Sequence, residues 1–126
     1  MKLKEIRELT RAEEEVMQVL WNLKQSFVKD MISYFKDPKP AYNTISTIVR
    51  ILEEKGFIDH KAYGKAHEYF PLISKSEYSK FVLKNLTKGY FSNSFKSLLS
   101  FMAEEENLSL HDIEEIQKII KQNNKK

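Results

Sequence analysis

The fold is decided by residues 41–56, which read AYNTISTIVRILEEKG. Four apolar side chains in this stretch follow the spacing i, i+3, i+4 and i+7, namely Ile45, Ile48, Val49 and Leu52. This spacing places them along one side of an α-helix, so the helix has one face for a core and another face for a partner. Gly56 suits the left-handed position that commonly follows a helix end. We therefore predict a helix over about residues 41–55.

Two helices are predicted before this stretch. Residues 10–13, TRAE, form a capping box, in which a Thr and a Glu side chain satisfy backbone N–H groups at a helix start. A second, short helix is indicated by an apolar stripe through Val28, Met31, Ile32 and Phe35. Residues 37–40, DPKP, end that helix, because proline lacks an N–H donor and disfavours helix in the residue before it.

A β-hairpin is predicted after the central helix. Residues 57–63 and 66–73 are rich in aromatic and β-branched side chains, and they flank a Gly-Lys pair at 64–65. Three helices followed by a hairpin is the order of a winged helix-turn-helix. We therefore expect a mainly α fold with a small β-hairpin, in which residues 1–73 form the winged-helix domain.

The composition narrows the classes of function. The 126 residues are 41% hydrophobic and 31% charged, which is typical of a folded protein. Cysteine is absent, which excludes disulfide scaffolds, cysteine-based metal centres and cysteine nucleophiles. No apolar run approaches the ~20 residues that a bilayer span needs, and the charged start of the chain lacks a signal-peptide pattern. We expect a cytoplasmic protein without a membrane partner.

The outward face of the helix at 41–55 suits base edges and phosphates. It presents polar side chains of moderate reach, namely Tyr42, Asn43, Thr44, Ser46, Thr47 and Arg50. Arginine suits guanine, asparagine suits adenine, and the threonine methyl can touch thymine. No acidic residue occurs from Pro38 to Leu52, whereas an ordinary solvated helix face, the alternative, mixes Lys with Glu. We predict that this helix reads the major groove of double-stranded DNA.

The hairpin supplies a second predicted DNA contact. Its tip gathers Lys61, Tyr63, Lys65 and His67, which suit phosphate contacts that position a protein without reading sequence. The alternative is a charged hairpin edge that prevents aggregation. The formal charge of +3 divides into +1 for residues 1–73 (12 basic, 11 acidic) and +2 for residues 74–126 (9 basic, 7 acidic). The prediction of DNA binding therefore rests on where the charges lie along the chain. The net charge does not support it.

Catalytic and metal motifs are missing from the sequence. Residues 67–68, His-Glu, begin like a metalloprotease motif, but Pro71 stands where the second His belongs. His60 and His67 can meet across the hairpin, but they have no third ligand in the sequence pattern. Glycine-rich phosphate loops and serine-nucleophile motifs do not occur. We therefore expect no enzyme activity, no cofactor and no metal.

Residues 74–126 carry more apolar surface than so short a segment can bury in a core of its own. The segment either folds back on the hairpin domain or pairs with the same segment of a second chain, and a symmetric operator favours a two-fold protein. We predict a homodimer interface formed by Tyr78, Phe81, Val82, Tyr90, Phe91, Phe95, Leu98, Leu99, Met102, Ile113, Ile116 and Ile120. Residues 1–73 are then the DNA-binding domain and residues 74–126 the helical dimerisation region.

Several stretches carry a family resemblance. The most specific are residues 9–13 (LTRAE), 16–17 (VM), 20–21 (LW) and 43–58 (NTISTIVRILEEKGFI), and residues 63–72 and 108–116 match in kind. Through these stretches, almost the whole chain resembles the penicillinase repressor family, the BlaI/MecI/CopY-type bacterial transcriptional regulators. The resemblance implies a homodimeric repressor whose winged helix reads an inverted-repeat operator and whose C-terminal helices intertwine.

The resemblance also implies a way to relieve repression. In the family's resistance members, an antibiotic signal from a membrane sensor leads to cleavage between Asn and Phe in the dimer interface. The matching position here is Ser100–Phe101, so Ser replaces Asn, and the implied partner is a sensor-linked protease. Copper-responsive relatives bind metal through C-terminal cysteines, which this chain lacks. Relatives usually place Arg before the Leu that matches Leu52, whereas here Ile51 stands there and Arg50 comes one position earlier.

The alternative function is a winged helix that binds a partner protein through its third helix. Salt-dependent binding to random duplex DNA separates the two functions, because a DNA-binding protein releases counterions from phosphates.

Overall fold

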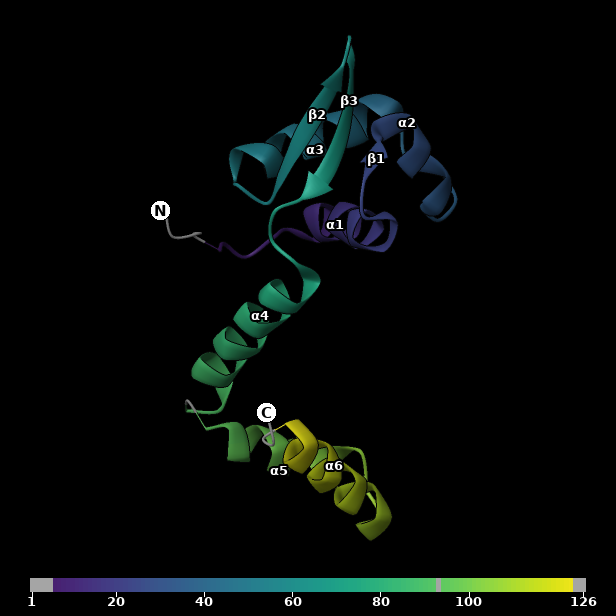
Figure 1. The fold of residues 1–126 in the computed structure, drawn as a ribbon. Helices are drawn as coiled ribbons and strands as arrows, with labels where there is room; N and C mark the ends of the chain where they lie inside the picture. Colours follow the sequence, from purple (N-terminus) through teal and green to yellow (C-terminus); the bar gives the residue numbers. More distant parts are fainter. Residues whose placement is uncertain (1–5, 93, 124–126) are drawn as a thin grey trace. The chain divides into compact units, whose positions relative to one another are not determined.

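The central helix of the computed structural model is α3, Tyr42–Glu54 (Figure 1). The structure describes residues 6–92 and 94–123. Ile45, Val49 and Leu52 are almost fully buried on one face of α3, which confirms the predicted core face. Gly56 follows the helix with a φ of +83°, a backbone conformation that strains residues with a Cβ atom.

Helix α1 spans Arg11–Leu23 and begins with the predicted capping box. Glu13 Oε1 accepts a hydrogen bond from Thr10 N at 2.9 Å, and Thr10 Oγ1 accepts one from Glu13 N at 3.2 Å. Lys55 Nζ lies 2.8 Å from Glu13 Oε1 and 2.9 Å from Oε2, which joins the start of α1 to the end of α3. Burial alone would raise the pKa of the Glu13 carboxyl, but the hydrogen bonds from Lys55 and Thr10 outweigh burial and lower the pKa.

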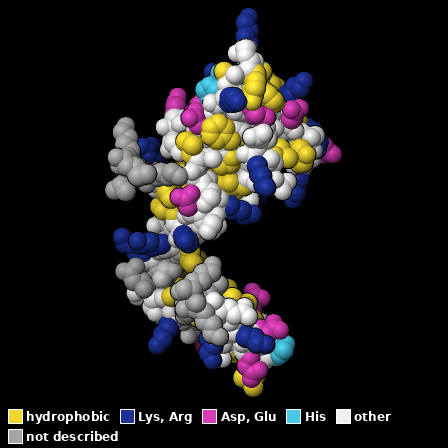
Figure 2. All heavy atoms as spheres, viewed as in Figure 1, with side chains coloured by type: hydrophobic (Ala, Val, Ile, Leu, Met, Phe, Trp, Pro, Cys, Tyr) yellow, Lys and Arg dark blue, Asp and Glu magenta, His cyan; other side chains and the backbone are white. Residues whose placement is uncertain are grey.

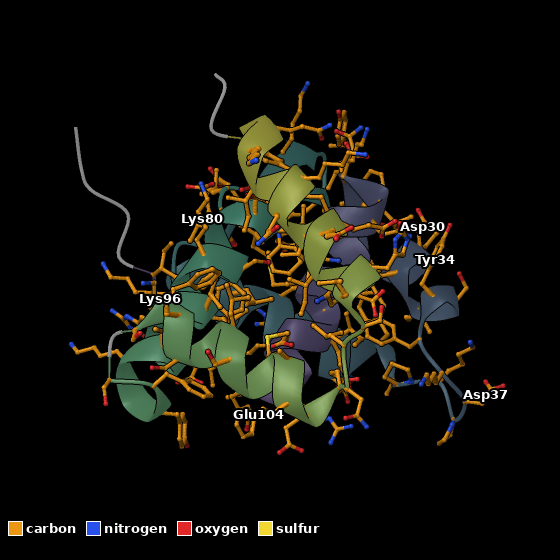
Figure 3. The ribbon with its side chains drawn as sticks, turned by 90° about the horizontal axis from the view of Figure 1, so that it is seen from below. Asp30, Tyr34, Asp37, Lys80, Lys96 and Glu104 are labelled. Carbon is orange, nitrogen blue, oxygen red and sulfur yellow. The ribbon has the colours of Figure 1, made fainter. Side chains whose placement is uncertain are left out.

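The short second helix is α2, Val28–Met31, and it tightens into a 3-10 turn, η1, over Ile32–Tyr34. The apolar stripe predicts one helix through Phe35, but the backbone at Phe35 is extended. The chain leaves the helix there because two prolines follow shortly, and a 3-10 turn is the usual form of such an ending. Figure 3 shows the side chains of Asp30 and Tyr34 pointing outward from this segment.

A three-stranded antiparallel sheet carries the hairpin. Its strands are β1 (Ser26–Phe27), β2 (Ile58–Tyr63) and β3 (Ala66–Pro71), in the order β1-β3-β2. Tyr69 of the middle strand lies opposite Ser26 on one side and His60 on the other. The hairpin is confirmed, and its tip contains Gly64 with a φ of +64°. Strand β1 is an addition to the prediction, because two residues are too few to show an alternating pattern.

The chain divides into two compact units, Met1–Val82 (the first unit) and Leu83–Lys126 (the second unit). The first unit has one hydrophobic core, whose most deeply buried side chains are Val16, Met17, Leu20, Met31, Val49, Leu52, Phe57, Ile58 and Ile73. Tyr78, in α4 (Lys75–Tyr90), belongs to the same core, and its hydroxyl accepts a 2.9 Å hydrogen bond from Leu9 N. The first unit therefore extends past the predicted domain boundary and includes the first half of α4.

The second unit contains the rest of α4 together with α5 (Phe95–Glu105) and α6 (Leu110–Asn123). Ser109 and Asp112 form a capping box at the start of α6, with both hydrogen bonds at 3.1 Å. Leu98 of α5 is buried, whereas many other large apolar side chains of this unit are exposed. Across residues 6–92 and 94–123, the helices are too short or too polar to cross a bilayer.

Candidate nucleic-acid interface

A hollow of about 620 Å³ opens between α2, α3 and β3, and we call it the α3 hollow. It is lined by Phe27, Val28, Lys29, Asp30, Tyr42, Ser46, Arg50, Lys65, Ala66, His67 and Tyr69. Five of these residues are predicted DNA contacts, namely Tyr42, Ser46 and Arg50 of α3 and Lys65 and His67 of the hairpin. The structure therefore brings the outward face of α3 and one side of the hairpin to the same place.

The other predicted contacts of α3 are exposed but lie outside the wall of the α3 hollow. They are Asn43, Thr44 and Thr47. The Thr47 hydroxyl donates a 2.9 Å hydrogen bond to the Asn43 carbonyl one turn earlier, which leaves the Thr47 methyl for outside contacts. The first turn of α3 contains no acidic residue, so the positive end of the helix dipole is uncompensated and suits a phosphate.

Tyr69 fixes the hairpin against α3. Its side chain is buried, and it interacts with the charges of Glu53 and Arg50 on α3. Burial raises the pKa of the Tyr69 hydroxyl and the Glu53 charge raises it further, while the Arg50 charge acts in the opposite direction. Tyr69 is therefore neutral at physiological pH, and its buried ring belongs to the core that joins the hairpin to α3.

The side chains of the hairpin pack in pairs. Lys61 Nζ lies 5.4 Å from the ring centre of Tyr63, and the Tyr63 ring lies 5.9 Å from that of Phe27. The rings of His60 and His67 stack with their centres 4.0 Å apart. Figure 2 shows a Lys or Arg side chain projecting at the very tip of the hairpin. The tip therefore presents positive charge, while Lys61 and Tyr63 lie outside the α3 hollow.

Two charged residues of the α3 hollow, Lys29 and Asp30, are additions to the sequence prediction. Both are exposed and follow Phe27, whose strand β1 pairs with β3. That pairing brings α2 to the hairpin, and it joins segments too distant in sequence for a local pattern to show. The sequence offers one signal that could have identified Lys29. It is a lysine at the start of the helix before α3, and the first helix of a helix-turn-helix crosses the DNA backbone.

The predicted dimer residues differ in how deeply they are buried. Tyr78 is buried in the core of the first unit, and the Phe81 ring stacks on it at 5.9 Å. These two side chains pack the first unit, because the start of α4 belongs to that unit and not to a separate C-terminal region. The large side chains that remain exposed are Val82, Tyr90, Phe95, Met102, Ile113 and Ile120, while Leu98 is buried and Phe91, Leu99 and Ile116 are partly buried.

The segment that matches the family's cleavage position lies inside α5. Ser100 and Phe101 are both exposed, and the Phe101 ring lies 5.5 Å from that of Phe91. Figure 3 shows α5 with the side chains of Lys96 and Glu104, which are exposed on either side of this position. The bond is thus held in helical backbone in this structure.

Known proteins are similar to this chain in sequence, and one solved structure is similar to it in fold. The family model described as penicillinase repressor matches residues 9–122. The methicillin resistance regulatory protein MecI of Staphylococcus aureus (strain N315) is 34% identical over 114 residues, which cover 90% of this chain and 93% of MecI. The penicillinase repressor of Bacillus licheniformis is 26% identical over 121 residues, which cover 95% of this chain and 94% of that protein.

A solved structure supports the fold class directly. The solution structure of the DNA binding domain of the repressor BlaI matches with a TM-score of 0.51 and 30% identity. The match covers 60% of this chain and 94% of that domain. The expected fold class, mainly helical with a small winged sheet, is thereby confirmed.

Proposed function

The chain belongs to the penicillinase repressor family, and on that premise we propose that it is a transcriptional repressor that binds operator DNA as a homodimer. The observation that carries the proposal is the α3 hollow, where Arg50 and Ser46 of α3 face the same space as Lys65 and His67 of the hairpin. The similarity to the DNA binding domain of BlaI supports the same reading.

In this proposal, α3 enters the major groove and the hairpin lies along the sugar–phosphate backbone. Arg50 and Asn43 have the side chains that discriminate bases, whereas Lys65 and Lys29 have the positive charge that attracts phosphates. Because operator DNA lies in the cytoplasm of a bacterium, the proposal places the protein there. Enzyme activity is no part of the function, in keeping with the repressors that make up the family.

Homodimer formation is proposed to occur through the second unit. Its support is the set of exposed apolar side chains on α5 and α6, including Phe95, Met102, Ile113 and Ile120. Side chains of this size are rarely left together in water, and a second copy of the chain presents a matching surface. Two winged units then read two half-sites, and their linkage raises affinity well above that of one half-site.

Repression is proposed to end when a sensor-linked protease cleaves Ser100–Phe101. The cleavage would divide α5 and weaken the dimer without changing the α3 hollow. Because the bond lies in helical backbone, α5 must unwind locally before a protease can bind it. The replacement of Asn by Ser at this position predicts that the protease of this chain differs in its preference from that of the resistance members.

The test is a selection of bound sequences from random duplex DNA, followed by footprinting of the selected site. We expect an inverted repeat with half-sites about one helical turn apart or a multiple of it, and an affinity that falls as salt rises. Failure to bind any duplex with a salt-dependent affinity would contradict the proposal and favour the protein-interaction module instead.

A further inference from the structure

A cluster of three side chains joins the end of α3 to the start of β2, outside the α3 hollow. His60 Nδ1 lies 2.5 Å from Glu53 Oε2 and 3.9 Å from Asp59 Oδ1. One ligand atom from each of the three residues lies within 4.8 Å of the other two. Glu53 and His60 are partly buried, while Asp59 is exposed. Two carboxylates and one imidazole therefore converge at a place that solvent ions can reach.

The spacing of these atoms suits a small transition-metal ion. Zinc binds imidazole nitrogen and carboxylate oxygen at about 2.0–2.2 Å, which places tetrahedral ligand atoms about 3.3 Å from one another. The distances of 2.5 Å and 3.9 Å from His60 Nδ1 fall on either side of that value. The three groups are therefore spaced on the scale that one bound ion requires.

Neighbouring groups hold the three ligands in place. Asp59 Oδ1 accepts a 2.8 Å hydrogen bond from the backbone N–H of His60, which keeps the carboxylate on the imidazole side. The His67 ring lies nearly parallel to the His60 ring, at an angle of 12°, and Tyr69 lies 5.6 Å from His60 on the same sheet face. These contacts limit rotation of the His60 ring, as the groups around a metal ligand commonly do. His67 thus acts as a packing partner and not as a ligand.

We propose that Glu53, Asp59 and His60 bind one divalent transition-metal ion of the zinc type, with water in the remaining position. Imidazole together with carboxylate selects zinc and related ions over magnesium, which prefers oxygen ligands alone. His60 would bind the ion through the lone pair of Nδ1, with the ring hydrogen on Nε2. The site was hidden from the sequence pattern because two of its three protein donors are carboxylates, and Glu53 comes from a different element than His60.

The ion would tie two elements that both belong to the proposed DNA interface. Glu53 lies on α3 one turn after Arg50, and His60 lies on the first strand of the hairpin. A metal bond between them restricts movement of the hairpin relative to α3. Metal binding itself does not depend on DNA, so this proposal and the proposed function can fail separately.

The test is a calorimetric titration of the full chain with Zn²⁺ after treatment with a chelator, repeated with Co²⁺ to record its visible absorption. We expect one ion per chain and a tetrahedral Co²⁺ spectrum. His60→Gln and Asp59→Asn should each weaken binding at least about tenfold. The matched control is His111→Gln, which removes a histidine that is also paired with one carboxylate, Glu115, at 3.2 Å; it should leave the affinity unchanged.

Three outcomes would overturn the proposal. They are no uptake of Zn²⁺ or Co²⁺ at millimolar concentration, unchanged affinity in both His60→Gln and Asp59→Asn, or a loss of binding in His111→Gln. Asp59→Asn keeps an oxygen that can accept the His60 N–H bond, and its side chain is exposed, so this variant is expected to fold. Fluorescence of Trp21, the single tryptophan, reports the folding of the first unit in every variant.

Discussion

Arg50 is an exposed, positively charged residue on a helix that the core holds in place. It is therefore our leading candidate for a base contact in the proposed DNA complex. It stands on the outward face of α3, and the next residue but one, Leu52, is fully buried in the core. The helix therefore cannot rotate to withdraw Arg50 without exposing core side chains. The guanidinium can donate two hydrogen bonds to the edge of guanine, which favours specificity in the proposed complex.

Replacing Arg50 with Ala is expected to weaken binding to the selected operator by about 1–3 kcal/mol and to relax base preference at one position of each half-site. The measurement is a competition assay between the operator and single-base variants. Lys96→Ala, which removes an exposed cation from α5, is the control and should change neither quantity. Unchanged discrimination in the Arg50 variant would mean that this face of α3 does not read bases.

Glu13 is a second residue with a defined energetic role. Its pKa is lowered below the ordinary value of 4.5, so the ionised carboxylate stabilises the fold. This stabilisation is complete above pH 4.5 and is lost as the pH falls through the pKa of the folded state. Replacing Glu13 with Gln should lower the free energy of unfolding by about 1–3 kcal/mol at pH 7, because Lys55 keeps its charge but loses its partner.

The measurement is urea unfolding followed by Trp21 fluorescence from pH 7 to pH 3. The difference between the wild type and Glu13→Gln should shrink as the pH falls, whereas Glu14→Gln, in the same helix turn but exposed, should behave like the wild type. An equal difference at pH 7 and pH 3 would show that the ion pair with Lys55 does not carry the effect.

At the scale of elements, the hairpin depends on its attachment to α3 and β1. Tyr69 of β3 is buried in the core that also contains residues of α3, and it pairs with Ser26 of β1. Nearer the tip, the Tyr63 ring lies 5.9 Å from the ring of Phe27 in β1. Such a hairpin can present cations to a phosphate backbone without taking part in base recognition.

Lys65→Ala should therefore weaken binding to all duplex sequences by a similar factor. The slope of log affinity against log salt should fall by about 1, because one phosphate contact is lost. Binding to operator and random DNA across a salt series measures both quantities. A change in base preference with an unchanged slope would place Lys65 at a base edge instead.

Helix starts and ends that neighbouring residues determine could be predicted from the sequence. Elements that depend on pairing between segments far apart in the chain could not. The capping box at Thr10 and the left-handed Gly56 are set by neighbouring residues, and both are found as predicted. Strand β1 and the place of Lys29 depend on pairing with β3, which has no local pattern. Tyr78 reads as part of an amphipathic helix in sequence, but its hydroxyl meets Leu9 N at the opposite end of the first unit's chain.

At the scale of the whole molecule, the two units differ in how completely they bury their apolar side chains. The first unit has a well-filled core, and its described side chains leave no buried polar atom without a hydrogen-bond partner. Among its described residues, the second unit has one deeply buried apolar side chain, Leu98, and many exposed large apolar side chains. Partner binding is therefore expected to stabilise the second unit far more than the first.

Ile113→Glu combined with Ile120→Glu should convert a dimer into a monomer. A carboxylate buried in an apolar interface costs about 3 kcal/mol or more, so the dissociation constant should rise at least about a hundredfold. Sedimentation across a concentration series measures this change, and operator affinity should fall with it. Lys118→Glu changes charge on the same helix and serves as the control; equal dimerisation in the double variant would exclude these two residues from the interface.

The two ladders of the sheet differ greatly in the length of chain that they enclose. β2 and β3 pair across a two-residue tip, whereas pairing of Ser26 with Tyr69 encloses all of α2 and α3. Closing the longer loop costs more chain entropy, so we expect the hairpin to form before the β1–β3 ladder. Because β1 leads directly into α2, the same ladder fixes the place of Lys29 at the α3 hollow. A chain with the hairpin formed and this ladder still open would therefore have an incomplete α3 hollow.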